Sequence, residues 1–151
     1  MTILAEATII GRGEGTSYPA AGAATTFKVR GEDTGGMFEV TETSLPAHFS
    51  GPPPHVHGRL DHAFYVLEAE IQYQVGDRIV RVVEGSTVFV PHGLGHTFSN
   101  PSDRRARMLQ IDSAGGREAM FKEISVAFPP GSTLDPPILL EILKRYDTRP
   151  A

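Results

Sequence analysis

Residues 85–100 read Gly85-Ser-Thr-Val-Phe-Val-Pro91-His92-Gly93-Leu-Gly-His96-Thr-Phe-Ser-Asn100. Glycine and proline punctuate this stretch, and a short run of β-type residues lies between Gly85 and Pro91. Short apolar runs bounded by turn residues are typical of strands. His96 opens a second run of this kind. The stretch therefore predicts two short strands joined by a turn that carries histidine.

A second histidine cluster precedes this one in the chain and reads Gly51-Pro-Pro-Pro-His55-Val-His57-Gly-Arg-Leu-Asp61-His62. Alternate residues of a strand share a face, so His55 and His57 are expected to point to the same side. Neutral imidazole is the commonest protein ligand for transition metals. If a small barrel brings the two clusters together, they would form a buried metal site.

Composition excludes several classes of function. There is no cysteine, which rules out disulfides, thiolate metal sites and a cysteine nucleophile. A net charge of −4 without a basic cluster argues against a nucleic-acid partner. The N-terminal run 1–10 does not resemble a signal peptide, and no apolar stretch is long enough to span a bilayer. We therefore expect no membrane partner, a cytoplasmic location and a single domain, 1–151.

Short β-rich segments separated by turns recur along the chain, which predicts an all-β sandwich or barrel. Gly76-Asp77 suits a tight hairpin. The inward parity slips near residues 68–70, which predicts two strands that meet at a corner. The expected strands cover residues 25–30, 37–45, 62–75, 78–84, 87–90, 96–100 and 105–112.

The C-terminal part has a different periodicity. Apolar residues at three- and four-residue steps over 116–128 and 137–146 predict two short helices, and Pro137 can open the second one. We expect these helices, the tail at about 116–146, to pack outside a barrel core at about 25–112. Six residues are assigned first to the core of this barrel: Phe64, Val66, Tyr73, Phe89, Phe98 and Met108.

These motifs resemble those of the cupins. The run from Gly85 to Asn100 matches the second cupin motif at every defined position, and His55 and His57 match the start of the first. The chain departs from the first motif in two places: His62 stands where the family has an acid, and Ala69 stands where it has a glycine. The resemblance covers roughly residues 35–112.

The resemblance implies a double-stranded β-helix, or jelly roll, with one divalent metal ion inside the barrel. Carried over position by position, the metal ligands are His55, His57, His62 and His96, and Asp61 competes with His62 for the fourth place. Cupins often dimerise, so a homodimer is expected. The family includes quercetin-cleaving dioxygenases, isomerases, decarboxylases, polyketide cyclases, storage proteins and ligand-binding regulators, so the fold alone does not specify a function.

Four imidazoles favour a divalent first-row transition metal (Zn, Fe, Mn, Ni or Cu) over Ca or Mg. With four neutral ligands the metal centre keeps about two positive charges, which makes it a stronger Lewis acid than a centre with one carboxylate ligand. The carboxylate that can serve as a base in the quercetin-cleaving relatives is missing. This absence weakens the hypothesis of a dioxygenase-like enzyme that cleaves flavonols.

The favoured hypothesis is therefore a metal-dependent enzyme that acts on a small organic molecule, aromatic or polyketide-like. Its chemistry would be oxygenation or a Lewis-acid cyclisation or isomerisation. The alternative is a non-catalytic ligand-binding or sensing domain with a structural metal. Candidates for polar groups beside the metal are Tyr73, Gln110 and His92.

Overall fold

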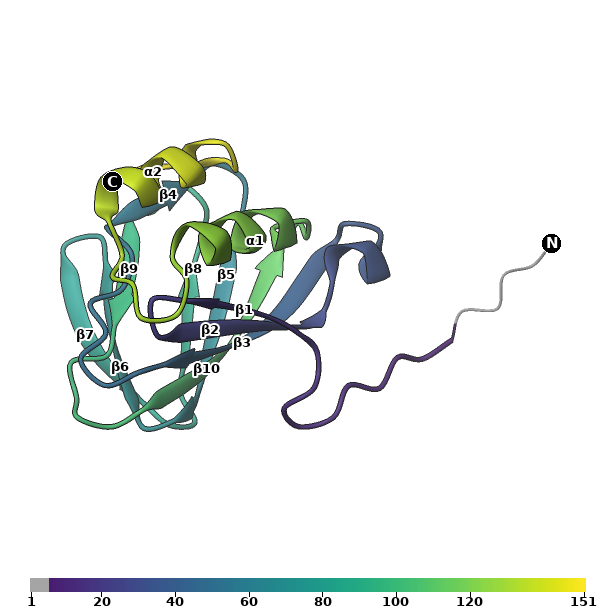
Figure 1. Ribbon diagram of the computed structural model, residues 1–151, viewed down its shortest axis with the longest axis horizontal. Helices are drawn as coiled ribbons and strands as arrows, with labels where there is room; N and C mark the ends of the chain where they lie inside the picture. The colour runs from purple at the N-terminus through teal and green to yellow at the C-terminus, as the bar shows by residue number, and fades with distance from the viewer. Residues whose placement is uncertain (1–5) are drawn as a thin grey trace.

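The computed structural model describes residues 6–151, so the first five residues of the N-terminal run discussed above lie outside the described part. Two antiparallel sheets face each other as a jelly roll (Figure 1). The first sheet has the order β1 (Thr16–Ala20), β2 (Ala23–Val29), β3 (Phe38–Leu45), β10 (Ala106–Ser113), β5 (His62–Glu68), β8 (Thr87–Val90). The second has the order β11 (Thr148–Pro150), β4 (His55–His57), β9 (His96–Ser99), β6 (Glu70–Val75), β7 (Arg78–Val83). This all-β double-stranded β-helix with two short C-terminal helices confirms the predicted fold class.

The predicted corner lies between β5 and β6. β5 ends at Glu68 in the first sheet, and β6 begins at Glu70 in the second. Ala69 between them has a φ of 62°, in the left-handed region that non-glycine residues rarely adopt. The change of inward parity in the sequence therefore marks the point where the chain passes from one sheet to the other. The predicted hairpin is also present, with Val75 opposite Arg78 and Gly76 at a φ of 58°.

The inner faces of β3 and β10 change from apolar to polar along their length. Leu45 and Met108 are buried at one end, where they join a core that also contains Phe64, Val66, Ile71, Tyr73, Val90 and Ala106. Glu39 and Asp112, which face each other in the register of the two strands, are buried at the other end. Because burying polar groups without partners is costly, the polar end marks the part of the barrel where a functional site is expected.

Phe89 does not belong to the core, and its assignment there was wrong. Its side chain is 62% exposed. β8 pairs with β5 so that Val88 lies opposite Phe64 and Val90 opposite His62, and these residues take the inner face. Phe89 therefore lies opposite Ala63 on the outer face of the sheet.

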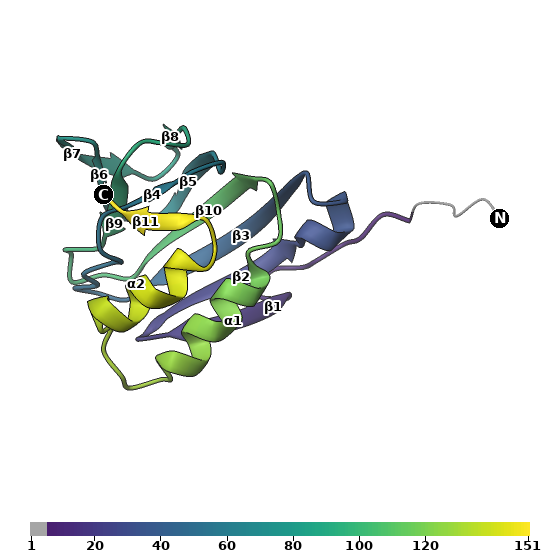
Figure 2. The same cartoon turned by 90° about the horizontal axis from the view of Figure 1, so that it is seen from above.

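Helices α1 (Glu118–Ala127) and α2 (Pro136–Lys144) lie beside β1 and β11, the edge strands of the two sheets (Figure 2). Glu118 anchors α1, because its carboxylate accepts hydrogen bonds from the Tyr18 hydroxyl (2.7 Å) and from Nε of Arg30 (2.8 Å). The side chain of Asp135 caps α2 by accepting from the backbone N–H of Ile138. Among residues 6–151, no helix is long and apolar enough to cross a membrane.

Both helices lie outside the two sheets, against their edge strands, yet they also contribute to the interior of the molecule. Their apolar side chains form a cluster of their own and line a cavity together with side chains from both sheets. Sequence periodicity identifies the apolar face of a helix but not the surface against which it packs. The helices therefore close the open side of the barrel.

Candidate metal centre

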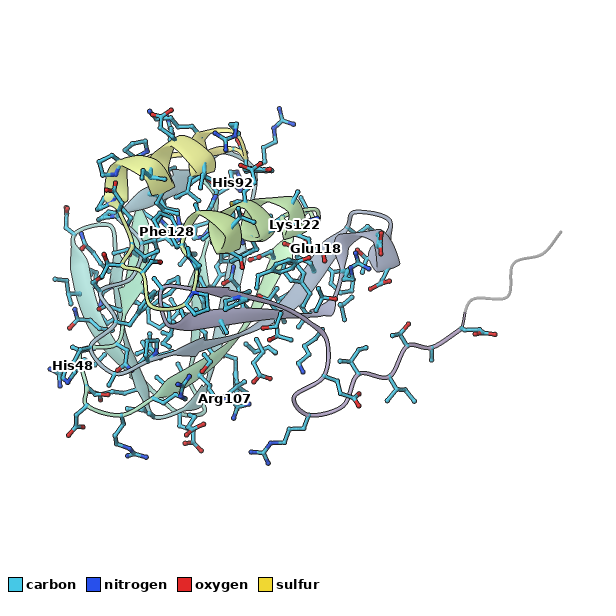
Figure 3. All side chains as sticks on the ribbon, in the orientation of Figure 1. His48, His92, Arg107, Glu118, Lys122 and Phe128 are labelled. Atoms are coloured by element: carbon cyan, nitrogen blue, oxygen red, sulfur yellow. The ribbon has the colours of Figure 1, made fainter. Side chains whose placement is uncertain are left out.

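The four histidines of the two clusters lie together inside the barrel. His55 and His57 come from β4, His62 from the start of β5 and His96 from the start of β9. All four are at most 6% exposed, and the ring centroids of neighbouring members lie 4.6 to 5.3 Å apart. The other two histidines, His48 and His92, are exposed on separate parts of the surface (Figure 3).

Gly51 determines how closely the β4 segment can approach β9. Its φ is +77°, and a Cβ atom at this position would lie 1.7 Å from the carbonyl oxygen of Phe98. Only glycine tolerates both the conformation and the contact. The run Pro52–Pro54 then leads into β4, where His55 pairs directly with His96 of β9.

Each of the four rings has an oxygen partner at Nδ1. The partners are the carbonyl of Pro53 for His55 (2.9 Å), the hydroxyl of Thr148 for His57 (2.9 Å), the carboxylate of Asp112 for His62, and the carbonyl of Leu94 for His96 (3.0 Å). An Nδ1–H that donates to oxygen leaves Nε2 as the ligand atom. Nε2 of His57 and of His62 are buried without any partner in the described part of the chain. Buried, unpaired Nε2 atoms fit a bound metal ion.

Three of the four histidines have ligand atoms that lie close enough together to share one ion. Ligand atoms of His55, His57 and His96 all lie within 4.8 Å of one another, and His62 is outside this group. His62 is nevertheless adjacent, with its ring centroid 4.6 Å from that of His57. Asp61, the competing fourth ligand, does not point into the site, because its carboxylate accepts from both the backbone N–H and the Nδ1 of His92.

Burial keeps all four imidazoles neutral. Desolvation lowers the pKa of His55 from 6.5 to about 3 and that of His96 to about 4. It also lowers the pKa of His57 and, against the opposing effect of Asp112, that of His62. Metal binding requires the neutral ring, so the site is in the form that coordinates an ion at neutral pH.

Asp112 was not singled out from the sequence, although it lies two residues after Gln110 and therefore on the same face of β10. It is fully buried and is held by Nη1 of Arg117 (2.5 Å) and Nε2 of Gln110 (2.9 Å). Burial raises the pKa of Asp112, but the Arg117 charge and the hydrogen bonds outweigh this effect and lower it overall. An ionised carboxylate thus lies directly behind the His62 ring.

Glu39 completes this network. Its Oε2 accepts from the backbone N–H groups of Gly116 (2.8 Å) and Arg117 (3.2 Å), which fixes the turn into α1. Burial raises the pKa of Glu39 above its ordinary value. Neither Glu39 nor Arg117 belongs to a recognisable motif. The pairing of β3 with β10 brings Glu39 to the site, and the Glu39 carboxylate fixes the turn that carries Arg117.

The three polar side chains that the sequence suggested beside the metal lie in three different environments. Gln110 lines the cavity beside the histidines. Tyr73 lies in the apolar core, where its hydroxyl donates to Sδ of Met108 (3.2 Å). His92 is on the surface, 59% exposed and hydrogen-bonded to Asp61.

A cavity of about 110 Å³ extends from the histidines to the helices. Beside the four histidines, its polar lining residues are Tyr18, Thr25, Thr43, Gln110 and Arg117. Most of the other lining residues are large and apolar: Leu45, Phe49, Phe64, Phe98, Met120, Phe121, Ile124, Leu134, Leu139 and Leu143. A second, larger cavity of about 430 Å³ shares Pro52, Phe98 and Leu134 with the first. The site is therefore a mostly apolar pocket that contains a cluster of histidines and a few other polar groups, the usual form of a small-molecule site.

A family model described as a cupin domain matches residues 41–112, a span that contains all four buried histidines and ends at Asp112. This segment of the chain is a cupin domain. This cupin is similar in fold to the polyketide cyclase RemF from Streptomyces resistomycificus (23% identity, 72% of this chain and 80% of that chain, TM-score 0.62). It is also similar to a predicted oxalate decarboxylase from Thermotoga maritima (16% identity, 71% and 99%, TM-score 0.66) and to KdgF from Halomonas sp. (15% identity, 76% and 99%, TM-score 0.65). At these identities the likeness of the cupin to its neighbours concerns the fold alone, and no curated protein matches its sequence.

Proposed function

We propose that this cupin is a metal-dependent enzyme in which His55, His57, His62 and His96 bind one divalent first-row transition metal. The observation that carries the proposal is the set of four buried rings, each held by an oxygen partner at Nδ1. Such partners fix the tautomer and orientation of a metal-binding histidine. The cavity beside these rings would hold a small organic substrate.

A divalent ion bound here would polarise a substrate carbonyl as a Lewis acid. The chain itself positions the substrate, because apolar side chains from both sheets and both helices surround the cavity and exclude water. Asp112 accepts a hydrogen bond from Nδ1–H of His62 and further hydrogen bonds from Arg117 and Gln110. With its oxygens engaged in this way, the carboxylate is not free to abstract a proton from the substrate.

Among the chemistries open to such a centre, we favour a non-redox step such as enolisation, isomerisation or cyclisation over oxygenation. Four neutral ligands leave the full charge of the ion on the centre, which strengthens a Lewis acid. One of the structural neighbours is a polyketide cyclase, which is consistent with this choice at the level of fold.

A second candidate is a binding or sensing domain whose metal stabilises the barrel. His57 supports it, because its Nδ1 partner Thr148 comes from β11, next to the C-terminus. A metal bound by His55, His57 and His62 would join β4 and β5, which belong to different sheets. Loss of metal would then lower stability without affecting any turnover.

For the assembly, we propose a single domain over residues 1–151 that forms a homodimer. Tyr65, Phe89 and Ile111 are exposed apolar residues on the outer face of the first sheet. Exposed apolar patches on a sheet are typical of protein interfaces. Light scattering of the purified protein measures the number of chains directly.

The function is tested by metal content and by anaerobic turnover. Protein purified without a metal-affinity tag should contain about one transition-metal ion per chain by mass spectrometry, and His57→Ala should lose it while His92→Ala retains it. Phenylpyruvate serves as the probe for enolisation. Proton NMR in D₂O without dioxygen follows the loss of the signal of its methylene protons, which lie next to the keto group. Exchange that is faster with wild-type protein than with His57→Ala supports the enzyme, whereas equal rates contradict it.

A further inference from the structure

Arg117 is the only cationic side chain among the described residues that line the cavity beside the histidines. Its side chain is 14% exposed. A guanidinium has five N–H donors, and within the described chain only Nη1 makes a side-chain hydrogen bond, to Asp112. The Nε and Nη2 donors of this cavity-lining residue therefore have no partner among the described residues.

The guanidinium is held in place from two sides. Asp112 binds Nη1, and the Phe121 ring of α1 lies beneath the guanidinium with Cζ 5.2 Å from the ring centroid. The Arg117 charge also contributes to the lowered pKa of each of the four histidines, which agrees with its position beside them. A guanidinium that is already oriented loses less freedom when it binds a ligand.

The buried charges around this end of the cavity do not cancel when a metal is bound. Arg117 and Asp112 neutralise each other, the four imidazoles are neutral, and a divalent ion adds two positive charges. Glu39 removes one of these charges when it is ionised and none when it is protonated. The loaded site is thus positive in either case, and an uncompensated charge in a buried site is unfavourable.

On the basis of the function proposed above, we propose that the physiological ligand of this site is an apolar monoanion, a single-ring or similarly sized molecule with a carboxylate or enolate group that accepts hydrogen bonds from Arg117. A cavity of about 110 Å³ limits its apolar body, since an engineered cavity of about 150 Å³ takes benzene. A longer substituent would pass Leu134 into the adjoining second cavity.

Benzoate and benzyl alcohol test this proposal because they share the ring but differ in charge. Their affinities are measured by NMR titration of zinc-loaded protein whose zinc content is known. We expect benzoate to bind about tenfold more tightly than benzyl alcohol. Arg117→Met should weaken benzoate binding by about tenfold and leave benzyl alcohol binding unchanged. Arg104→Met, in an exposed loop, is the matched control and should alter neither affinity.

Arg117→Lys is the second variant, which keeps the positive charge next to Asp112 but loses the planar guanidinium. It should weaken benzoate binding less than Arg117→Met does. It also provides the test if Arg117→Met fails to fold. Equal affinities for the two ligands, or unchanged benzoate binding in the Arg117 variants, would overturn this proposal while the metal-dependent function remains. A protein that binds no zinc, cobalt or nickel would overturn the function, and this proposal with it. Measured metal content separates the two cases.

Discussion

Asp112 and His62 face each other across neighbouring strands, and the Asp112 carboxylate is hydrogen-bonded to Nδ1 of the His62 ring. The chain has histidine where the cupin motif has an acid, but an acid is still present, one strand away and behind the ring. A carboxylate in that position makes imidazole a better ligand and fixes its orientation. Arg117 and Gln110 hold the carboxylate in turn.

Asp112→Asn should weaken metal binding by about 10- to 100-fold, the usual effect of removing an outer hydrogen-bond partner of a metal-bound histidine. Asp61→Asn is the matched control, since Asp61 also binds a histidine, but the exposed His92. Metal affinity is measured by competition with a chelator of known affinity. Equal affinities of the two variants would show that Asp112 does not support His62 as a ligand.

The role of His62 itself is tested by comparison with His57. If His62 is the fourth ligand, His62→Ala should bind metal more weakly than wild type while keeping the three histidines that already lie together, and His57→Ala should bind more weakly still. The visible spectrum of cobalt-substituted protein reports the coordination change. A His62→Ala spectrum identical to that of wild type would restrict the centre to three histidines.

Stability of the metal-free protein should fall with acid. Unfolded histidine takes up a proton near pH 6.5, whereas burial lowers the pKa of folded His55 to about 3 and that of folded His96 to about 4. Between these values the unfolded state binds more protons, so the free energy of unfolding decreases as the pH falls from 6.5 towards 4. Each of the two residues should contribute about 1.4 kcal/mol per pH unit.

Urea unfolding of chelator-treated protein at pH 6.5, 5.5 and 4.5 measures this slope. The double variant His55→Gln/His96→Gln removes both titrating groups and should show a shallower dependence over the same range. An unchanged slope in the double variant would mean that other groups cause the acid sensitivity.

The sequence predicts local features of this site better than long-range ones. The spacing of His55 and His57, the turn around Gly93 and the parity slip near Ala69 are properties of short segments, and each leaves a visible pattern. That the four histidines would lie together followed from the family resemblance rather than from any local rule. Their close packing in the barrel agrees with that expectation.

The residues that were missed depend on pairing between distant segments. Asp112 meets His62 only through the register of β5 and β10, and Thr148 meets His57 only because β11 pairs with β4. Arg117 reaches the site because Glu39 fixes the turn before α1. The sequence also did not predict that the helices line the cavity, since an amphipathic pattern does not identify the surface that it covers.

The helical wall of the cavity provides the last prediction. Leu139 is 3% exposed and lines the cavity, whereas its neighbour Ile138 on α2 is 51% exposed. Leu139→Ala should lower the free energy of unfolding by about 2–4 kcal/mol because it leaves a void, and Ile138→Ala should lower it by less than about 1 kcal/mol. Urea denaturation measures both values.

The same void enlarges the cavity, so Leu139→Ala should bind 1-naphthoate more tightly than wild type does, while Ile138→Ala should not. If the two variants were equally stable and bound 1-naphthoate equally, α2 would not form a wall of the ligand cavity.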